Sequence, residues 1–377
     1  MKRETMMSNN GDNGASKDVL TEILSRLPVK SLLRFRCVCH YWYALIKTSS
    51  FITKHHHKNN IRLLVQHYES DYRYAIGILT DENLGSTAPL YYNLDEHGIE
   101  INPDSVIGPI NGIYCLYDRN EHSMCLWNPA IREFRPISLP RLNLPSYISD
   151  PTSNFGFGVD PMTNNYKLIW LRQFWDDNLD GPYDLQTVLV YNLCTNSWRL
   201  FEIPRDQSRI VRNSLGNSTY MNGVYYWLVE DYYNDYCILS FDLTNENFYD
   251  LPTLSEIPKS KFGELALYDN SIAIILFHPN EIENYIEIWA MKEEGFWTKQ
   301  LTMGPILDVL VPIGFWDNDR QLLIRTNSGR MILYNINTLE SRDLGYYGLE
   351  SALQVYRFKE SLFSLKEGDN SFSMVQA

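Results

Sequence analysis

The chain has 377 residues, of which 44% are hydrophobic and 21% are charged, values that are typical of a globular protein and exclude a disordered one. The net charge is −13 at pH 7: residues 17–58 contribute +6 and residues 1–16 contribute zero, which leaves −19 for residues 59–377. Such an acidic region repels nucleic acid and favours a basic protein partner. The alternative is that the charge serves only solubility.

The first residues and the cysteines indicate the compartment. Residues 1–16 contain no apolar core of a signal peptide and are predicted to be a disordered lead. No window reaches the roughly 18 apolar residues of a membrane span. We interpret the cysteines as reduced, buried thiols. The six are Cys37, Cys39, Cys115, Cys125, Cys194 and Cys237. We therefore expect a protein of the cytosol, with the nucleus as the alternative, that contacts no membrane.

Residues 17–60 carry the strongest helix signals of the chain. The first apolar stripe at helical spacing consists of Val19, Leu20, Ile23, Leu24 and Leu27. Two further apolar sets are Val29, Leu32, Leu33, Phe35, Cys37 and Val38, and then Trp42, Leu45 and Ile46. Pro28 ends the first helix, because proline has no backbone donor and clashes with the preceding turn. We expect three short helices, and so small a unit cannot hide its apolar surface alone.

The run ILSRLPVKSLLRFRCVC, followed by Trp42, resembles an F-box of plant type. The resemblance implies a docking module for a Skp-family adaptor, which a cullin-based ubiquitin ligase carries. It assigns adaptor binding to Val19, Leu20, Ile23, Leu24, Leu27, Pro28, Val29, Leu32, Leu33, Cys37, Val38 and Trp42. The family usually begins with Leu-Pro where this chain has Ala15 and Ser16, so we expect a weaker first contact. An ordinary three-helix N-terminal cap is the alternative.

From about residue 60 the chain alternates strand-length apolar runs with Asn, Asp, Gly and Pro turns. Five segments repeat an aromatic residue with a nearby polar turn, and the last four anchors are Tyr191, Phe241, Trp289 and Tyr334. Antiparallel repeats of about 50 residues predict propeller blades of kelch type. The fold class is therefore mainly β with a small helical N-terminal module, and a β-sandwich is the alternative.

We expect six blades in residues 61–377. Five lie along the chain, at residues 108–139, 153–203, 218–252, 263–301 and 311–344. The sixth joins residues 353–365 to residues 61–79, which closes the ring and removes its sheet edges. Tryptophans of these repeats, among them Trp227 and Trp316, are predicted to pack in the sheets rather than to form a ligand cage.

The propeller region also resembles a known family. GPINGIYCLYD, WNPAIREFRPISLP, FGFGVDPMTNNYKL and the segments that follow are similar to the plant F-box-associated domain, most of all in S-locus F-box proteins of self-incompatible plants. The resemblance implies a non-catalytic receptor that holds a substrate lysine near activated ubiquitin. The S-locus variant implies a basic S-ribonuclease as substrate, in the pollen-tube cytosol. The alternatives are a plant F-box receptor with an unrelated target, and a propeller enzyme or lectin-like module.

Two acidic loops are the candidate substrate contacts, because binding residues often lie on loops of a rigid scaffold. The first contains Asp176, Asp177, Asp180 and Asp184, and the second contains Glu230, Asp231, Tyr232, Tyr233, Asp235 and Tyr236. Solvated turns are the alternative. His55, His56 and His57 cannot all point one way on a helix and have no partner at ligand spacing, so we expect a solvated basic helix end. The sequence indicates no cofactor and no metal site.

Overall fold

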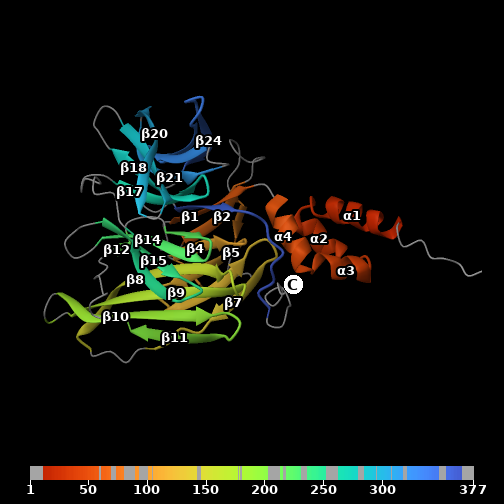
Figure 1. Ribbon diagram of the computed structural model, residues 1–377, viewed down its shortest axis with the longest axis horizontal. Coiled ribbons are helices and arrows are strands. Elements are labelled where there is room, and N and C mark those ends of the chain that lie inside the picture. Colours follow the sequence, from red (N-terminus) through yellow and green to blue (C-terminus); the bar gives the residue numbers. More distant parts are fainter. Residues whose placement is uncertain are drawn as a thin grey trace, which may run out of the picture.

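The computed structural model consists of a small helical unit placed against one side of a larger β domain (Figure 1). The structure describes residues 12–58, 61–68, 74–79, 90–92, 101–103, 105–141, 146–176, 178, 181–202, 213–214, 218–230, 236–251, 262–278, 284–293, 295–306, 308–316, 321–347 and 354–366. The statements below concern these residues.

The helical unit has four helices where the sequence predicted three. They are α1 (Asp12–Leu24), α2 (Val29–Phe35), α3 (His40–Ile46) and α4 (Ser49–Lys58). The break at Pro28 is present, with Pro28 in the extended conformation that precedes α2. The additional break falls at Thr48, whose hydroxyl accepts a hydrogen bond from the backbone N–H of Phe51 at 3.3 Å. A threonine at this position caps a new helix, which is why α3 does not continue into α4.

The β domain is a propeller of six antiparallel sheets, as predicted. The first three sheets comprise β4 (Ser105–Ile110), β5 (Ile113–Asp118), β6 (Ser123–Asn128) and β7 (Glu133–Ile137); β8 (Ile148–Asp160), β9 (Asn165–Asp176), β10 (Gly181–Asn192) and β11 (Ser197–Glu202); and β12 (Asn213–Ser214), β13 (Thr219–Met221), β14 (Val224–Glu230), β15 (Tyr236–Asp242) and β16 (Asn247–Leu251).

The next two sheets comprise β17 (Phe262–Tyr268), β18 (Ser271–His278), β19 (Asn284–Glu293) and β20 (Phe296–Ile306); and β21 (Val309–Phe315), β22 (Gln321–Thr326), β23 (Arg330–Asn335) and β24 (Ser341–Tyr347). The sixth is formed by β25 (Gln354–Phe358), β1 (Arg62–Tyr68), β2 (Tyr74–Leu79) and β3 (Leu90–Tyr92). Here β25, near the end of the chain, pairs with β1 in antiparallel register from Gln354 opposite Gln66 to Phe358 opposite Arg62. The ring is therefore closed by both ends of the domain.

One part of the sixth-blade prediction is wrong. The strand ends at Phe358, and residues 359–366 leave the sheet and run between the propeller and the helices (Figure 1). The alternating run Ser361-Leu362-Phe363-Ser364-Leu365 has the period of a strand. In the structure its apolar side chains are divided between two cores instead, since Leu362 joins the core of the helices and Leu365 joins the core of the propeller.

Apolar side chains fill the interface between each pair of neighbouring blades. One continuous cluster joins the first, second and third blades, and four more clusters join the third to the fourth, the fourth to the fifth, the fifth to the sixth and the sixth to the first. In the last of these, Leu64 and Phe358 meet Tyr114 and Trp127. This continuous packing around the ring is the expected way for a propeller to bury the faces of its sheets.

A turn motif explains the repeat that the sequence displays. A side-chain oxygen of Asn or Asp at the end of one strand accepts a hydrogen bond from a backbone N–H two or three residues later. The residue four positions after it has a positive φ. Six turns of this kind are described, and they begin at Asp118, Asn128, Asp160, Asn192, Asp242 and Asn335. No such turn is found among the described residues of the fourth blade, where Gly295, with φ of 83°, lies between β19 and β20.

Candidate functional site

The N-terminal helices expose large apolar side chains at a higher density than the rest of the described structure. Among the described residues ten such side chains are exposed, and five of them lie in this short unit. These five are Val19, Ile23, Val38, Tyr41 and Tyr43. Val19 and Ile23 are one helical turn apart on α1, so both lie on the same face. Exposed apolar residues at this density make this surface the candidate contact for another protein.

The structure divides the residues that the sequence assigned to adaptor binding. The exposed ones are Val19, Ile23, Pro28, Cys37 and Val38. The half-buried ones are Leu20, Leu27, Leu33 and Trp42, and the buried ones are Leu24, Val29 and Leu32. The last three form the core of the helices together with Ile46, Phe51 and Ile52. A partner cannot reach these three side chains, which can support a binding surface only by holding the helices in place.

The core of the helices is completed by the segment that follows β25. Leu362 is 1% exposed and packs in the cluster that contains Val29 and Leu32. Glu360 accepts a hydrogen bond from the backbone N–H of Val29 at 2.9 Å, and its other carboxylate oxygen lies 2.8 Å from Nη1 of Arg62. The first turn of a helix has unpaired N–H groups and positive potential, so a carboxylate stabilises it. Helix α2 thus obtains its N-terminal partner from the far end of the chain.

The same segment is fixed to the first blade of the propeller. The side-chain amide of Asn128 donates to the carbonyls of Ser361 (3.1 Å) and Phe363 (2.8 Å). Glu133 accepts hydrogen bonds from the backbone N–H of Leu365 (2.8 Å) and the hydroxyl of Ser364 (2.9 Å). Residues 359–366 therefore act as a clamp, and we use that name for them below. The clamp holds the helices against the β6–β7 turn.

The histidines at the end of α4 take part in this junction, and the expectation of a solvated helix end is wrong. His55 is fully buried, with Nε2 2.9 Å from the carbonyl of Leu27. His56 lies with Nδ1 3.2 Å from the carbonyl of Glu360. Burial lowers the pKa of His55, and burial also lowers the pKa of His56 to about 4 despite its bond to Glu360. Only His57 is exposed.

The cysteine prediction is half right. All six thiols are free; Cys115, Cys125 and Cys237 are buried, while Cys37, Cys39 and Cys194 are exposed. Cys37 lies in the turn after α2, and Cys39 directly precedes α3. Burial raises the pKa of Cys115 and raises that of Cys125 to about 12, so both thiols stay protonated.

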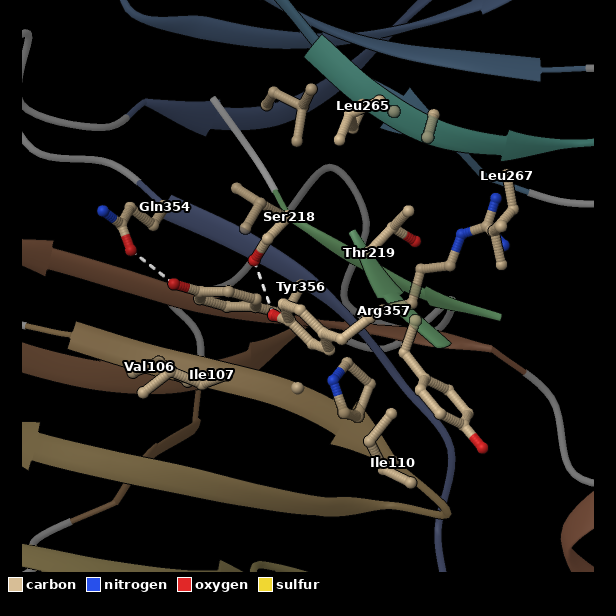
Figure 2. Close-up of a pocket in the computed structure, with 18 of the residues that line it drawn as sticks. Val106, Ile107, Ile110, Ser218, Thr219, Leu265, Leu267, Gln354, Tyr356 and Arg357 are labelled. Carbon is tan, nitrogen blue, oxygen red and sulfur yellow. Dashed lines mark hydrogen bonds between the residues drawn. The ribbon is translucent and has the colours of Figure 1, made fainter. Parts of the chain in front are cut away.

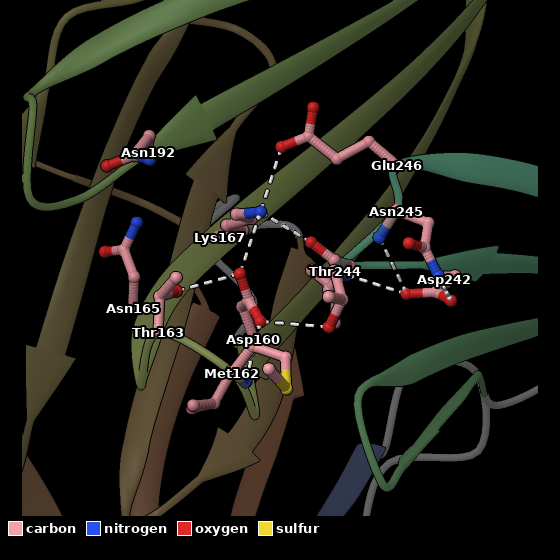
Figure 3. A network of polar contacts seen from close by, with 12 residues as sticks. Asp160, Met162, Thr163, Asn165, Lys167, Asn192, Asp242, Thr244, Asn245 and Glu246 are labelled. Carbon is pink, nitrogen blue, oxygen red and sulfur yellow. Dashed lines mark hydrogen bonds and ion pairs between the residues drawn. The ribbon is translucent and has the colours of Figure 1, made fainter. Parts of the chain in front are cut away.

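A network of polar contacts joins the second and third blades (Figure 3). Lys167 is buried, and its ammonium lies 3.2 Å from Asp160, 2.9 Å from Glu246 and 2.5 Å from the carbonyl of Leu243. Asp160 also accepts hydrogen bonds from the hydroxyls of Thr163 and Thr244. Because its charges and donors satisfy one another, we assign this cluster a structural role between blades.

The described residues of the two acidic segments lie in paired strands of the second and third blades. Asp176 ends β9 and pairs with Gly181 of β10, and Asp184 lies within β10. Glu230 pairs with Tyr236 across β14 and β15. The other predicted residues, Asp177, Asp180, Asp231, Tyr232, Tyr233 and Asp235, lie outside the described residues. The four described residues, Asp176, Asp184, Glu230 and Tyr236, thus lie in strands rather than in loops, and the role of both segments in substrate binding stays a prediction.

Neither a metal site nor a membrane-spanning helix is found in the part of the chain that the structure describes. No three His, Cys, Asp or Glu side chains of this part come together in a way that could hold a metal ion. None of its helices has the length and apolar character needed to cross a bilayer.

The clamp is not predictable from the sequence alone. Glu360 makes its helix contact across 331 residues of sequence, and no local pattern signals such a partner. One signal could have indicated the segment itself: the apolar run around Leu362 comes after the last strand that is needed to close the ring, so it has no place in a blade.

Comparison with known proteins matches both regions. Residues 16–54 match the F-box domain, and residues 68–363 match the F-box associated beta propeller domain. An F-box/kelch-repeat protein of Arabidopsis thaliana is 26% identical over 330 residues, covering 84% of this chain and 86% of its own. An F-box protein of the same plant is 30% identical over 299 residues, covering 74% and 87%. The F-box protein CPR1 of Arabidopsis is 22% identical over 353 residues, covering 85% and 82%.

Proposed function

The chain belongs to the F-box proteins with an F-box-associated β-propeller domain, and we propose that it is the substrate-recognition subunit of a Skp–cullin–F-box ubiquitin ligase. The observation that carries the proposal is the apolar surface of the F-box helices, where Val19, Ile23 and Val38 are each more than half exposed. A Skp-family adaptor would cover this surface and link the chain to the cullin. The propeller would then present a protein substrate.

In this role the chain is not an enzyme. The receptor accelerates transfer of ubiquitin by proximity, because it holds a substrate lysine close to the activated ubiquitin. The clamp supports this role, since it fixes the F-box to the propeller through Asn128, Glu133, Glu360 and Leu362. A fixed distance between adaptor and substrate suits a reaction that depends on position.

Co-purification with a Skp-family adaptor tests the proposal. Ile23→Asp and Val38→Asp should each abolish it, because buried apolar anchors of an interface contribute about 2 kcal/mol or more. Both side chains are exposed in the free chain, so the thermal melting temperature should stay unchanged. Leu32→Asp is a poor test, since Leu32 is buried and the substitution would unfold the helices.

Leu200→Asp on β11 is the matched control, because Leu200 is 50% exposed on the propeller surface and should not contact the adaptor. Adaptor binding that survives both Ile23→Asp and Val38→Asp would contradict the proposed surface. Ala15 and Ser16, which stand where the family usually has Leu-Pro, lie inside α1, so Ser16→Pro would also shorten this helix and is not used as a test.

For the substrate we propose a basic protein that is recognised by the two acidic loops. The S-locus resemblance implies one such protein, an S-ribonuclease in the pollen-tube cytosol. The support is the charge of −19 on residues 59–377. Asp176→Asn with Asp177→Asn should slow association with a basic S-ribonuclease and flatten its salt dependence, because rim charges act mainly on the encounter. Association rates measured at two salt concentrations check this. A rate independent of salt would contradict it.

A further inference from the structure

A cavity lies at the centre of the propeller ring. Its volume is about 670 Å³, within the range of ordinary ligand pockets. All six blades contribute to its walls, mostly through the first strand of each sheet: β4, β8, β13, β17, β21 and β25. Because these strands come from six separate repeats, no contiguous part of the sequence displays the site.

The walls of the cavity combine apolar side chains with neutral hydrogen-bonding groups (Figure 2). The apolar ones include Val106, Ile107, Ile110, Leu265, Phe315 and Trp316. Neutral polar groups come from Ser105, Asn111, Asn154, Ser218, Thr219 and Gln354. Burial raises the pKa of both Tyr225 and Tyr356, so their phenols remain neutral; Tyr225 bonds to Ser218 at 2.5 Å and Tyr356 donates to Gln354.

Among the described residues that line this cavity, one side chain is charged, and it is positive. Arg357 of β25 is exposed to the cavity side, and no Asp, Glu, Lys or His is among the lining residues. Its Nε donates a hydrogen bond to the carbonyl of Phe315 on β21, which holds the side chain against the wall. This sign is opposite to the −19 carried by residues 59–377. The centre of the ring therefore differs electrostatically from the domain around it.

We infer that the cavity binds a ligand with an apolar body and a carboxylate, in which the carboxylate pairs with Arg357. A guanidinium is suited to a carboxylate, which it can bind through two parallel hydrogen bonds. A basic side chain is disfavoured, because none of the described wall residues is anionic and could compensate its charge once it left water. The apolar wall would bury the body of the ligand, and the hydroxyl and amide groups would receive its remaining polar atoms.

Two sources could supply this chemistry: the carboxyl terminus of a polypeptide with apolar final residues, or a free apolar organic acid. The first source rests on the proposed function, since it would make the cavity the seat of the substrate's last residues. It is also compatible with a basic substrate, whose body would face the acidic loops while its terminal carboxylate entered the ring. The second source would make the acid a regulator of the receptor.

Affinity selection with the full-length chain distinguishes these sources. The probes are a pool of random hexapeptides with free carboxyl termini, the same pool with carboxamide termini, and a mixture of octanoate and 4-phenylbutyrate. Bound probes are separated by ultrafiltration and identified by mass spectrometry. We expect carboxylates to be retained about tenfold more than the matching amides, as a charged hydrogen-bonded pair would give.

Three variants test the assignment of residues. Arg357→Gln should remove the preference for carboxylates. Thr219→Trp should reduce retention while leaving Arg357 in place, because Figure 2 shows Thr219 beside Arg357 at the cavity. Arg342→Gln on the exposed outer strand β24 is the control and should retain the preference. Thermal melting of each variant verifies that the propeller is folded.

Retention of free-acid peptides identifies a polypeptide terminus, and retention of the organic acids alone identifies a small acid. Equal retention of acids and amides, no retention of either, or a preference that persists in folded Arg357→Gln would overturn the inference. Adaptor co-purification is measured on the same samples. It depends on the F-box and not on the cavity, so a failure of the proposed function is seen separately.

Discussion

The propeller and the F-box complete their cores in different ways. In the propeller each interface between blades is filled by the two blades that meet there, and the ring closes through pairing of β25 with β1. In the F-box the core includes Leu362, which comes from the far end of the chain. On the surface of the same unit, Val19, Ile23 and Val38 stay exposed.

This difference follows from size. A ring of about 300 residues can bury both faces of its sheets internally, whereas a unit of fewer than 50 residues cannot bury enough apolar surface to be stable alone. The F-box therefore needs a second element, and the clamp supplies it. What the comparison teaches is that the two apolar faces of the F-box have different uses: one fixes it to the propeller, and the other is left for a partner.

Removal of the last strand should break both regions at once. A chain that ends at Gly345 lacks β25 and the clamp, so it exposes an edge of β1 and opens the core of the F-box. We expect aggregation, measured by size-exclusion chromatography, and loss of the cooperative melting transition. A chain that ends at Lys366 is the control and should melt like the full-length protein. A soluble, sharply melting chain ending at Gly345 would contradict a ring closed by β25.

Loss of the buried ammonium between blades should weaken the propeller and leave the F-box surface unchanged. Lys167→Met leaves Asp160 and Glu246 without their shared cation, and breaking a buried ion pair costs about 3–5 kcal/mol. Urea unfolding of the full chain measures the loss. Lys292→Met is the control, because its pair with Asp269 is exposed and contributes about 1 kcal/mol or less. Equal effects of the two substitutions would count against the proposed link between blades.

Truncation of the clamp residue should act mainly on the F-box. Leu362→Ala removes a fully buried side chain, which typically costs about 2–5 kcal/mol. We expect amide hydrogen exchange to accelerate in α2 and α4 while the blades keep their protection. Leu339→Ala is the control, since Leu339 is 63% exposed. If exchange in the helices did not change, the F-box would be independent of the clamp.

Mild acid should lower the stability of the F-box more than that of the propeller, and this effect should be smaller than those above. Burial lowers the pKa of His56 to about 4 from 6.5, so the unfolded chain takes up the proton first. The contribution of neutral His56 to the free energy of unfolding is complete above about pH 6.5. It is lost as the pH falls toward 4, by at most about 1.4 kcal/mol per pH unit. His55, Lys359 and the carbonyl of Glu360 face this ring, and the pKa of His55 is also lowered by burial.

The propeller should resist this range of pH. Burial tends to raise the pKa of Asp160, but hydrogen bonds from Thr163 and the backbone of Met162 keep it below its usual value of 3.8. The contribution of Asp160 to stability is therefore lost only at lower pH.

The test of His56 is the free energy of unfolding at pH 7 and at pH 5. Because His56→Gln removes the titrating ring, this free energy should fall less between the two pH values in the variant than in the unaltered chain. His122→Gln, on an exposed turn, is the control and should leave the pH dependence unchanged.

Much of the propeller could be predicted from the sequence, because each blade carries its own local signal. The Asn or Asp that begins a turn and the aromatic residue before it recur within about 50 residues, and both are determined by contacts inside one sheet. The closing blade could be predicted from strands left over at the two ends. The clamp could not, since the alternation around Leu362 also fits a strand and its partners are distant in sequence.

The binding surfaces were less predictable for a related reason. Val19, Ile23 and Leu24 all fall on one apolar stripe, and helical spacing alone does not tell which of them face the core. The side that Leu24 faces depends on α4 and on Leu362. The central cavity depends on six strands that are remote from one another, so Arg357 and Trp316 show no shared pattern before the ring is formed.

The clamp also imposes an order on the making of this protein. Glu360 lies 331 residues after the Val29 that it caps, so the F-box leaves the ribosome well before the segment that completes its core. At usual rates of synthesis this delay is roughly 20 to 70 seconds. During that time the helices are present without the segment that positions them. A chain whose translation stops early carries an F-box with no fixed orientation to a propeller, so only a finished product can bring an adaptor and a substrate together at a set distance.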